Sequence, residues 1–314
     1  MHADVLANGQ FCRAATAPIP TFPQRGKESR QISLNRSFIA RLFPPARMAE
    51  GGLWAARAFF SSGFVSSFLF LKAIMDLLSG KGIVKRFGSL AVLRGVDITI
   101  RRGEALGVVG PNGAGKTTLF GVLAGTLPAS EGQVFFEGQD ISAWPAATRC
   151  RHGIARTHQV PRPFLGMSVL ENTLVAAQHG AGMRGAAALK QAQDALDRVG
   201  LGALAARPTA TLGLLDRKRL ELARTLATQP TVLLLDEIGG GLTEGELHQL
   251  VDLIGTLRDD GLTIVWIEHV LHALLRVIDR LVCMDAGAVL AEGTPHEVMA
   301  NPLVMSAYLG GVAA

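Results

Sequence analysis

Residues 110–118 read GPNGAGKTT and fit the pattern G-x-x-x-x-G-K-[ST], which is typical of loops that bind phosphate groups. The pattern follows an apolar run at 105–110, which predicts a strand, and precedes a predicted helix that starts at Lys116 and ends near Gly125. A strand, a glycine-rich turn and a helix are the context in which such a loop wraps a phosphate. The stretch therefore predicts an α/β fold with a phosphate site at the end of its strand.

Each residue type in this loop has a task in phosphate binding. Glycines let the backbone curl so that several N–H groups point inward, and the start of the helix adds a partial positive charge. Lys116 would place a full charge on the β- and γ-phosphates of a nucleotide, and the Thr117 hydroxyl is suited to coordinate Mg²⁺. The predicted nucleotide-binding residues are Gly110, Pro111, Asn112, Gly113, Ala114, Gly115, Lys116, Thr117 and Thr118.

A second motif, LLLDE at 233–237, ends an apolar run with two carboxylates. A buried strand explains the leucines but not the acidic pair at its carboxyl end, where ligands bind in open α/β sheets. Asp236 is suited to hold Mg²⁺ through water, and Glu237 to polarise an attacking water as general base. His269 follows the next apolar run, TIVWIE at 263–268, and is a candidate contact of the γ-phosphate. The alternative for His269 is a hydrogen bond that serves structure alone.

Strand and helix patterns alternate along the second half of the chain. Apolar, β-rich runs at 231–237, 263–268 and 280–287 are separated by helical patterns, which predicts a mostly parallel sheet. Residues from about 165 to 228 are rich in alanine and leucine at helical spacing and carry almost no strand signal. This block predicts a separate helical lobe.

Composition and charge exclude several classes of protein. Hydrophobic residues make up 48% and charged residues 18%, which indicates a globular chain. Residues 1–74 hold nine Lys/Arg against three Asp/Glu, whereas 75–314 hold 22 against 23, so the excess basicity lies outside the main domain and nucleic acid is not the predicted partner. Three cysteines, at 12, 150 and 283, form neither a metal pattern nor a disulfide framework and favour a reducing cytoplasm.

Three further stretches carry a family resemblance: KRFGSLAVLRGVDITIRRGE (85–104), GIARTHQVPRPFLGMSVLENTLVAA (153–177) and AEGTPHEVMANPLVMSAYLG (291–310). With the motifs above, they make the chain from about Met75 to Gly311 resemble the ATP-binding subunits of ABC transporters, most of all the branched-chain amino acid type. The resemblance implies a P-loop NTPase fold of the ABC ATPase cassette kind over 75–314. Such a cassette has a RecA-like core with a mostly parallel sheet, an antiparallel β subdomain and a helical subdomain, here about 165–228.

The N-terminal extension, 1–74, is punctuated by prolines and shows no sustained period. Its run FFSSGFVSSFLFL (59–71) is shorter than the roughly 20 apolar residues of a membrane span and lies too deep for a signal peptide. Three alternatives stay open: a disordered tail, a membrane-surface segment, or residues that are not translated because Met75 is the true start. We favour the last, since the cassette pattern begins within a few residues of Met75.

The resemblance also implies cofactors, partners and further site residues. The cofactors would be ATP and Mg²⁺. Phe87, in KRFG, would stack on adenine, its alternative being an ordinary core residue of the β subdomain. Gln159, in RTHQ, would touch Mg²⁺ and the attacking water and relay the presence of the γ-phosphate toward a permease.

The partners implied by the resemblance include a second cassette, as homodimer or heterodimer, packed head to tail. Each ATP would then lie between the phosphate loop of one subunit and the signature segment of the other. The helical lobe would dock on a membrane permease, which a solute-binding protein serves indirectly. The implied location is cytoplasmic, peripheral on the inner face of the cell membrane.

The signature segment departs from the family pattern. Residues 212–216 read LGLLD where the family usually has Leu-Ser-Gly-Gly-Gln. Gly213 lacks the serine hydroxyl that would bond the partner's γ-phosphate, and Leu215 replaces a glycine that lets backbone N–H groups approach it. Asp216 brings a negative charge near that phosphate, or instead caps a helix starting at Arg217. In a second departure, Glu237 is not followed by the usual proline, and Thr243 stands where an aspartate often lies.

Two functions of different class follow. In the first, the chain is an ATP-hydrolysing subunit that powers an importer of branched-chain or other hydrophobic amino acids, with urea, short amides or aromatic acids as other cargoes. In the second, it is a nucleotide-binding regulatory subunit whose degenerate signature forms a weak site in an asymmetric dimer. A small-molecule kinase would have neither helical lobe nor signature helix. The first is favoured because the hydrolytic set is complete: Lys116, Gln159, Asp236, Glu237 and His269.

Overall fold

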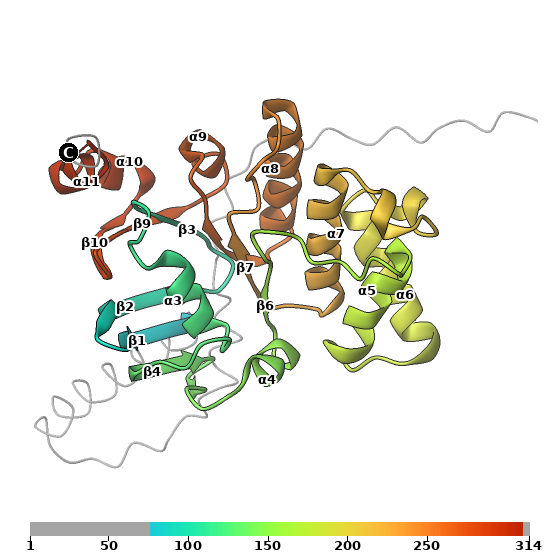
Figure 1. Cartoon of the computed structure of the whole chain (residues 1–314), viewed down its shortest axis with the longest axis horizontal. Helices are drawn as coiled ribbons and strands as arrows, with labels where there is room; N and C mark the ends of the chain where they lie inside the picture. Colours follow the sequence, from blue (N-terminus) through green and yellow to red (C-terminus); the bar gives the residue numbers. More distant parts are fainter. Residues whose placement is uncertain (1–75, 310–314) are drawn as a thin grey trace, which may run out of the picture. The chain divides into compact units, whose positions relative to one another are not determined.

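The computed structural model describes residues 76–309, so the extension at 1–74, Met75 and residues 310–314 lie outside the described part (Figure 1). The alternatives for the extension therefore stay predictions. The elements in chain order are β1 (Asp76–Phe87), β2 (Leu90–Arg101), β3 (Ala105–Val109), α3 (Lys116–Leu123), β4 (Glu131–Phe136), β5 (Gln139–Asp140), α4 (Ala146–Arg151), β6 (Ile154–Arg156), α5 (Val169–His179), α6 (Gly185–Arg198), α7 (Leu214–Ala227), β7 (Val232–Asp236), α8 (Glu244–Asp259), β8 (Thr263–Ile267), α9 (Leu271–Leu274), β9 (Arg280–Asp285), β10 (Ala288–Gly293), α10 (Pro295–Met299) and α11 (Pro302–Leu309). Two short 3₁₀ turns, Gly202–Leu204 and Thr209–Thr211, lie between α6 and α7.

A six-stranded sheet in the order β10-β9-β3-β8-β7-β6 forms the centre of the fold. Its strands run parallel except for the edge pair β9 and β10, which is antiparallel. Every residue of β3, β7 and β8 is buried, which explains why these strands read as unbroken apolar runs. The prediction of a mostly parallel sheet is confirmed, and the carboxyl ends of its parallel strands share one edge.

A second sheet, in the order β2-β1-β4-β5, is antiparallel throughout and is the β subdomain that the resemblance implied. It is joined to the central sheet where Arg94 donates its N–H to the carbonyl of Gly287, 2.9 Å away. Arg280 of β9 is buried and pairs with Glu104, 2.7 Å away, and with Glu292. Arg280 Nη2 also donates to the carbonyl of Thr99 in β2, so this side chain joins the two sheets directly.

Helices α5, α6 and α7 pack on one another to one side of the central sheet (Figure 1). Ser168 starts α5 with a reciprocal capping box, in which its hydroxyl accepts from the Glu171 N–H and the Glu171 carboxylate accepts from the Ser168 N–H. This α5–α7 group occupies the stretch in which the sequence showed helical spacing without strand signal.

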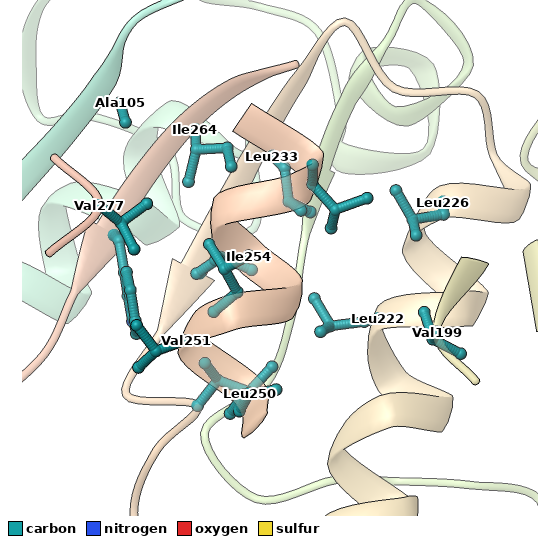
Figure 2. Close-up of a cluster of buried hydrophobic side chains, with 14 of the residues drawn as sticks. Ala105, Val199, Leu222, Leu226, Leu233, Leu250, Val251, Ile254, Ile264 and Val277 are labelled. Carbon is teal, nitrogen blue, oxygen red and sulfur yellow. The ribbon is translucent and has the colours of Figure 1, made fainter. Parts of the chain in front are cut away.

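One apolar cluster joins this helical group to the sheet through α8. All of the residues labelled in Figure 2 are buried, and Ile254 of α8 lies between the sheet and α7. The labelled members are Ala105, Val199, Leu222, Leu226, Leu233, Leu250, Val251, Ile254, Ile264 and Val277. Because the interior is close-packed, α7 cannot move relative to the sheet without disturbing α8. Among the helices within 76–309, none is long and apolar enough to cross a membrane.

Arg149 of α4 is 2% exposed and satisfies the end of α3. Its Nη1 donates to the carbonyls of Val122 and Leu123 at 2.7 and 2.8 Å. Its Nη2 and Nε donate to three carbonyls of the 141–144 loop at 2.8, 3.2 and 3.1 Å. Carbonyls in the last turn of a helix lack partners within the helix, so Arg149 caps the helix that carries the phosphate loop.

Replacing Arg149 by methionine keeps the aliphatic stem but removes its donors from the carbonyls of Leu123, Ser142 and Trp144, whereas those of Val122 and Ile141 keep the N–H groups of Gly125 and Trp144. We expect Arg149→Met to lower the free energy of unfolding by about 3 kcal/mol, measured by urea unfolding with linear extrapolation. Arg151→Met on the same helix is the matched control, because Arg151 is exposed, and should change stability little. Equal losses in the two variants would contradict the capping role.

Candidate functional site

The loop from Gly110 to Gly115 needs glycine at three positions because its backbone is left-handed there. Gly110, Gly113 and Gly115 have φ values of 144°, 83° and 97°. A Cβ on Gly110 would lie 2.0 Å from the carbonyl oxygen of Met284, and one on Gly115 would lie 2.8 Å from a methyl carbon of Leu93. Side chains at these two positions are therefore excluded both by conformation and by space.

Lys116 begins α3 and points its side chain back across the loop. It is 5% exposed, and its Nζ donates to the carbonyls of Gly110 at 2.8 Å and Pro111 at 3.1 Å. Burial lowers the pKa of Lys116 from its usual value, while the negative charges of Glu237 and Asp236 act in the opposite direction. The loop thus encloses a cation that faces the two carboxylates of the second motif.

Asp236 ends β7 and meets the phosphate loop directly. The Thr117 hydroxyl donates to Asp236 Oδ1 at 3.3 Å, although the two residues are 119 positions apart in the chain. The Asp236 N–H donates to the Thr157 hydroxyl at 3.2 Å. On its other oxygen, Oδ2, the carboxylate accepts from Arg156 Nη2 at 2.6 Å. Sequence reasoning gave Arg156 no role, although it stands in the quoted RTHQ motif.

Glu237 is held by the two other residues predicted to act in hydrolysis. Its Oε1 lies 2.6 Å from His269 Nε2, and its Oε2 accepts a hydrogen bond from Gln159 Nε2. Glu237 has a left-handed backbone with φ of 47°, which is strained for a residue with a side chain. Three strand ends, those of β6, β7 and β8, therefore direct Gln159, Glu237 and His269 to one point.

A cleft of about 350 Å³ opens between these groups and the loop, and we call it the phosphate cleft. Its lining residues are Val92, Asn112, Gly113, Gly115, Lys116, Thr117, Thr118, Gln159, Glu237 and His269. Gly110, Pro111 and Ala114 complete the loop without lining the cleft, and Ala114 is buried beneath it. Val92 was missed by sequence reasoning, because a valine in a β-rich run carries no signal of its own.

Phe87 lies at the end of β1 and is 47% exposed, so it is not a core residue of the β subdomain. The ammonium of Lys85 stands 5.1 Å from the centre of its ring. Phe87 is not among the residues that line the phosphate cleft, and its role toward adenine stays a prediction.

The signature residues Gly213 and Leu215 also lie away from the phosphate cleft of their own chain. Helix α7 begins at Leu214 with the exposed Gly213 as its N-cap, so the expectation that Asp216 caps a helix starting at Arg217 is wrong. Asp216 lies inside the first turn, where its negative charge complements the positive end of the helix dipole, and its carboxylate is 3.8 Å from Arg219. Leu215 is partly buried against the hydrophobic core.

The second departure, at Thr243, has a local structural reason. Thr243 is the N-cap of α8 and forms a capping box with Glu246, so a threonine here starts the helix. Between Glu237 and this cap, Gly239 donates its N–H to Glu268 Oε2 at 3.0 Å. A Cβ on Gly239 would lie 2.8 Å from that same oxygen, so a side chain at position 239 would crowd the Glu268 carboxylate.

Two charged residues of α7 hold the segment that carries Gln159. Lys218 is 2% exposed and its Nζ donates to the Gln159 carbonyl at 2.8 Å. Glu221 Oε1 lies 2.8 Å from His158 Nδ1. Burial raises the pKa of Glu221, but the hydrogen bond from His158 and the charge of Arg224 outweigh it, so the net shift is downward. Neither contact could be read from the sequence, because the partners are about 60 positions apart.

A second cleft, of about 250 Å³, lies between α4, β6, α5 and α7, and we call it the lobe groove. Its lining includes Cys150 of α4, Arg156 of β6, Ala176 of α5 and Arg224 of α7. Next to it, the guanidinium of Arg224 stands 5.1 Å from the centre of the Phe164 ring.

Asp236 does not line the phosphate cleft itself but contacts Thr117, which does, and the oxygens of this pair fit a hard divalent cation. Thr117 Oγ1 and Asp236 Oδ1 stand side by side, and Mg²⁺ prefers one or two such oxygen ligands together with phosphate oxygens and waters. The loop's backbone amides, the start of α3 and the Lys116 ammonium suit a polyphosphate. The cleft therefore has the chemistry of a site for a nucleotide and magnesium.

Comparison with known proteins places this geometry in a family context. A family model described as ABC transporter matches residues 93–239, and one described as branched-chain amino acid ATP-binding cassette transporter matches residues 288–314. The high-affinity branched-chain amino acid transport ATP-binding protein LivG of Salmonella typhimurium is 38% identical over 250 residues, which cover 74% of this chain and 98% of LivG. BraF of Pseudomonas aeruginosa, with the same description, is 35% identical over 74% of this chain and 98% of its own.

Solved structures agree with these sequence comparisons. A nucleotide-free ATP-binding cassette from an ABC transporter superimposes with a TM-score of 0.68 at 32% identity and covers 74% of this chain and 99% of its own. The ADP conformation of MJ1267, an ATP-binding cassette of an ABC transporter, gives a TM-score of 0.68 at 34% identity over 75% of this chain and 99% of its own.

Proposed function

This chain belongs to the ATP-binding subunits of ABC transporters, ATPases that power transport, and we propose that Glu237, Gln159 and His269 carry out hydrolysis in its phosphate cleft. The observation that carries the proposal is that Gln159 and His269 both bond the Glu237 carboxylate, in the cleft that Lys116 and the phosphate loop also line.

In the proposed mechanism, Glu237 accepts the proton of the attacking water as general base. The bonds from Gln159 and His269 hold its carboxylate in one orientation, which lowers the barrier because a positioned base needs no reorganisation. His269 would also contact the γ-phosphate, and Gln159 would contact the metal and the water. Lys116 and the loop amides neutralise the β- and γ-phosphates.

Mg²⁺ is proposed as the metal, held by Thr117 and Asp236 with Gln159 nearby. When bound with ATP, the cation would offset charge on the phosphate oxygens. Phe87 is proposed to stack on the adenine, and its 47% exposure leaves a ring face open to a base.

We further propose that the active form is a dimer, in which the signature segment of one subunit completes the cleft of the other. The placing of Gly213 and Leu215 away from their own cleft supports this arrangement. Gly213 is exposed and adds no side chain at the start of α7, so the backbone and the helix dipole there would bind the partner's phosphate without a serine hydroxyl.

The lobe groove is proposed as the docking site of the permease, with this subunit on the cytoplasmic face of the membrane. Beside the groove, the segment 160–167 exposes four large apolar side chains, which is unusual on a soluble surface. They are Val160, Phe164, Leu165 and Met167. This surface lies on the chain segment directly after Gln159, so a docked helix would press on the residue that senses the nucleotide.

The proposed cargo is a branched-chain or other hydrophobic amino acid, delivered to the permease by a solute-binding protein. Support comes from the names of the relatives at 35–38% identity and from the match of 288–314 to the branched-chain type. The alternative of a purely regulatory subunit is not favoured, because these relatives are described as transport ATP-binding proteins.

The hydrolytic assignment is tested by removing the proposed base. Glu237→Gln should retain ATP binding but lose hydrolysis by roughly 10²- to 10⁴-fold, because the amide cannot accept the proton. Lys116→Ala should instead lose nucleotide binding. ATP binding by calorimetry and phosphate release give the two readouts, with Glu244→Gln, an exposed residue at the start of α8, as control. Unchanged turnover in Glu237→Gln would refute the assignment.

The signature is tested with Gly213→Ser, because a Cβ at Gly213 meets nothing within 4 Å and serine fits without strain. If backbone amides do the signature's work, kcat should change by less than about twofold, and stability should rise by a few tenths of a kcal/mol from the better N-cap. A gain in kcat of tenfold or more would show that the missing hydroxyl limits the site and would favour the regulatory alternative. Leu215 is left unchanged because its partly buried side chain supports the core.

The docking surface and the cargo are tested together in the assembled transporter, which contains this subunit and its permease. Leucine-loaded solute-binding protein should stimulate hydrolysis, and Leu165→Asp should abolish the stimulation, since a carboxylate would face an apolar contact. ATP binding by the isolated variant should stay intact. Leu303→Asp, at a side chain of similar exposure on α11, is the control. Stimulation that survives Leu165→Asp would remove this segment from the interface.

A further inference from the structure

Asp236 has a cationic partner within the chain itself. Its side chain is 3% exposed, and Arg156 Nη2 stands 2.6 Å from Oδ2. Among the residues between 76 and 309, Arg156 makes the only ion pair with this carboxylate. The Lys116 ammonium instead donates to the carbonyls of Gly110 and Pro111.

The pair is built into the sheet rather than formed by loose surface chains. Arg156 ends β6 and Asp236 ends β7, and these strands are neighbours in parallel register. The Arg156 side chain is 18% exposed, and its Nη1 also donates to the Thr126 hydroxyl at 3.2 Å. Arg156 lines the lobe groove, and it pairs with the Asp236 oxygen that Thr117 does not contact.

A buried carboxylate without a partner is strongly unfavourable, whereas one that is paired and hydrogen-bonded is tolerated. The two carboxylate oxygens of Asp236 have different partners. Oδ2 is taken by Arg156, and Oδ1 faces Thr117 at the phosphate cleft. One carboxylate can therefore keep its charge compensated from the groove side while the other oxygen stays directed to the cleft.

We propose that Arg156 is the resident counter-cation of Asp236, a positioning residue that compensates the metal-binding carboxylate when no divalent cation is present and keeps Oδ1 turned to Thr117. The inference rests on the proposed metal role of Asp236. It predicts that folding of this protein does not require Mg²⁺, and that loss of Arg156 creates such a requirement.

The test follows the melting temperature of the full chain without nucleotide, in EDTA and in millimolar MgCl₂, with NaCl of equal ionic strength to correct for screening. Wild type should melt at the same temperature in both. Arg156→Gln should melt roughly 5–10 °C lower in EDTA, from the unpaired buried charge, and should recover part of the loss in MgCl₂. Arg156→Lys should behave like wild type, because an ammonium can still pair.

Arg224→Gln is the matched control. Arg224 lines the same groove at similar exposure but pairs with Glu221, so its loss should leave the response to Mg²⁺ unchanged. The double variant Arg156→Gln with Asp236→Asn removes the buried charge as well. It should melt above Arg156→Gln in EDTA and should not respond to Mg²⁺.

Three results would overturn the proposal. The melting temperature of Arg156→Gln could be as insensitive to Mg²⁺ as that of wild type, or Mg²⁺ could raise the melting temperature of Arg224→Gln as much as that of Arg156→Gln. The third is a double variant that melts no higher in EDTA than Arg156→Gln. If Arg156→Gln does not fold, recovery of folding in the double variant supports the proposal, and failure of both shows that Arg156 acts through packing alone. Because no nucleotide is used, these outcomes leave the test of hydrolysis at Glu237 independent.

Discussion

The contact between Thr117 and Asp236 is the constraint on which the site depends. It can form only because β3 and β7 run parallel in one buried sheet, so that both carboxyl ends reach the same edge. The loop after β3 and the acidic pair after β7 then face each other without any further adjustment. The same edge receives His269 from the end of β8 and Gln159 from the end of β6, and this explains why four distant segments form one cleft.

Much of this arrangement could be predicted because it follows from local pattern. The glycines, Lys116 and the acidic pair occur at fixed places relative to strands, and the structure brings them together. Arg156 and Lys218 could not be predicted, since their partners are set by strand neighbours and helix packing rather than by spacing. The start of α7 was misjudged because Gly213 caps a helix without any side-chain signal of the usual kind.

Buried charge links the site to the helical lobe. Lys218 and Glu221 lie on α7 and hold the segment of His158 and Gln159, while the same helix is packed against α8 through Leu222 and its neighbours (Figure 2). A displacement of Gln159 therefore strains two hydrogen bonds to α7, and α7 in turn resists through a close-packed core. Two hydrogen bonds, from Lys218 to Gln159 and between Glu221 and His158, thus connect the phosphate cleft to the helical lobe.

The Asp236 carboxylate has a geometric consequence. Thr117 belongs to one cavity and Arg156 to the other, so a single side chain is all that separates them along this line. If a permease docks at the lobe groove as proposed, the path from that partner to the proposed metal ligand is one side chain long. A shift of the Arg156 guanidinium would then act on the Asp236 carboxylate that contacts Thr117.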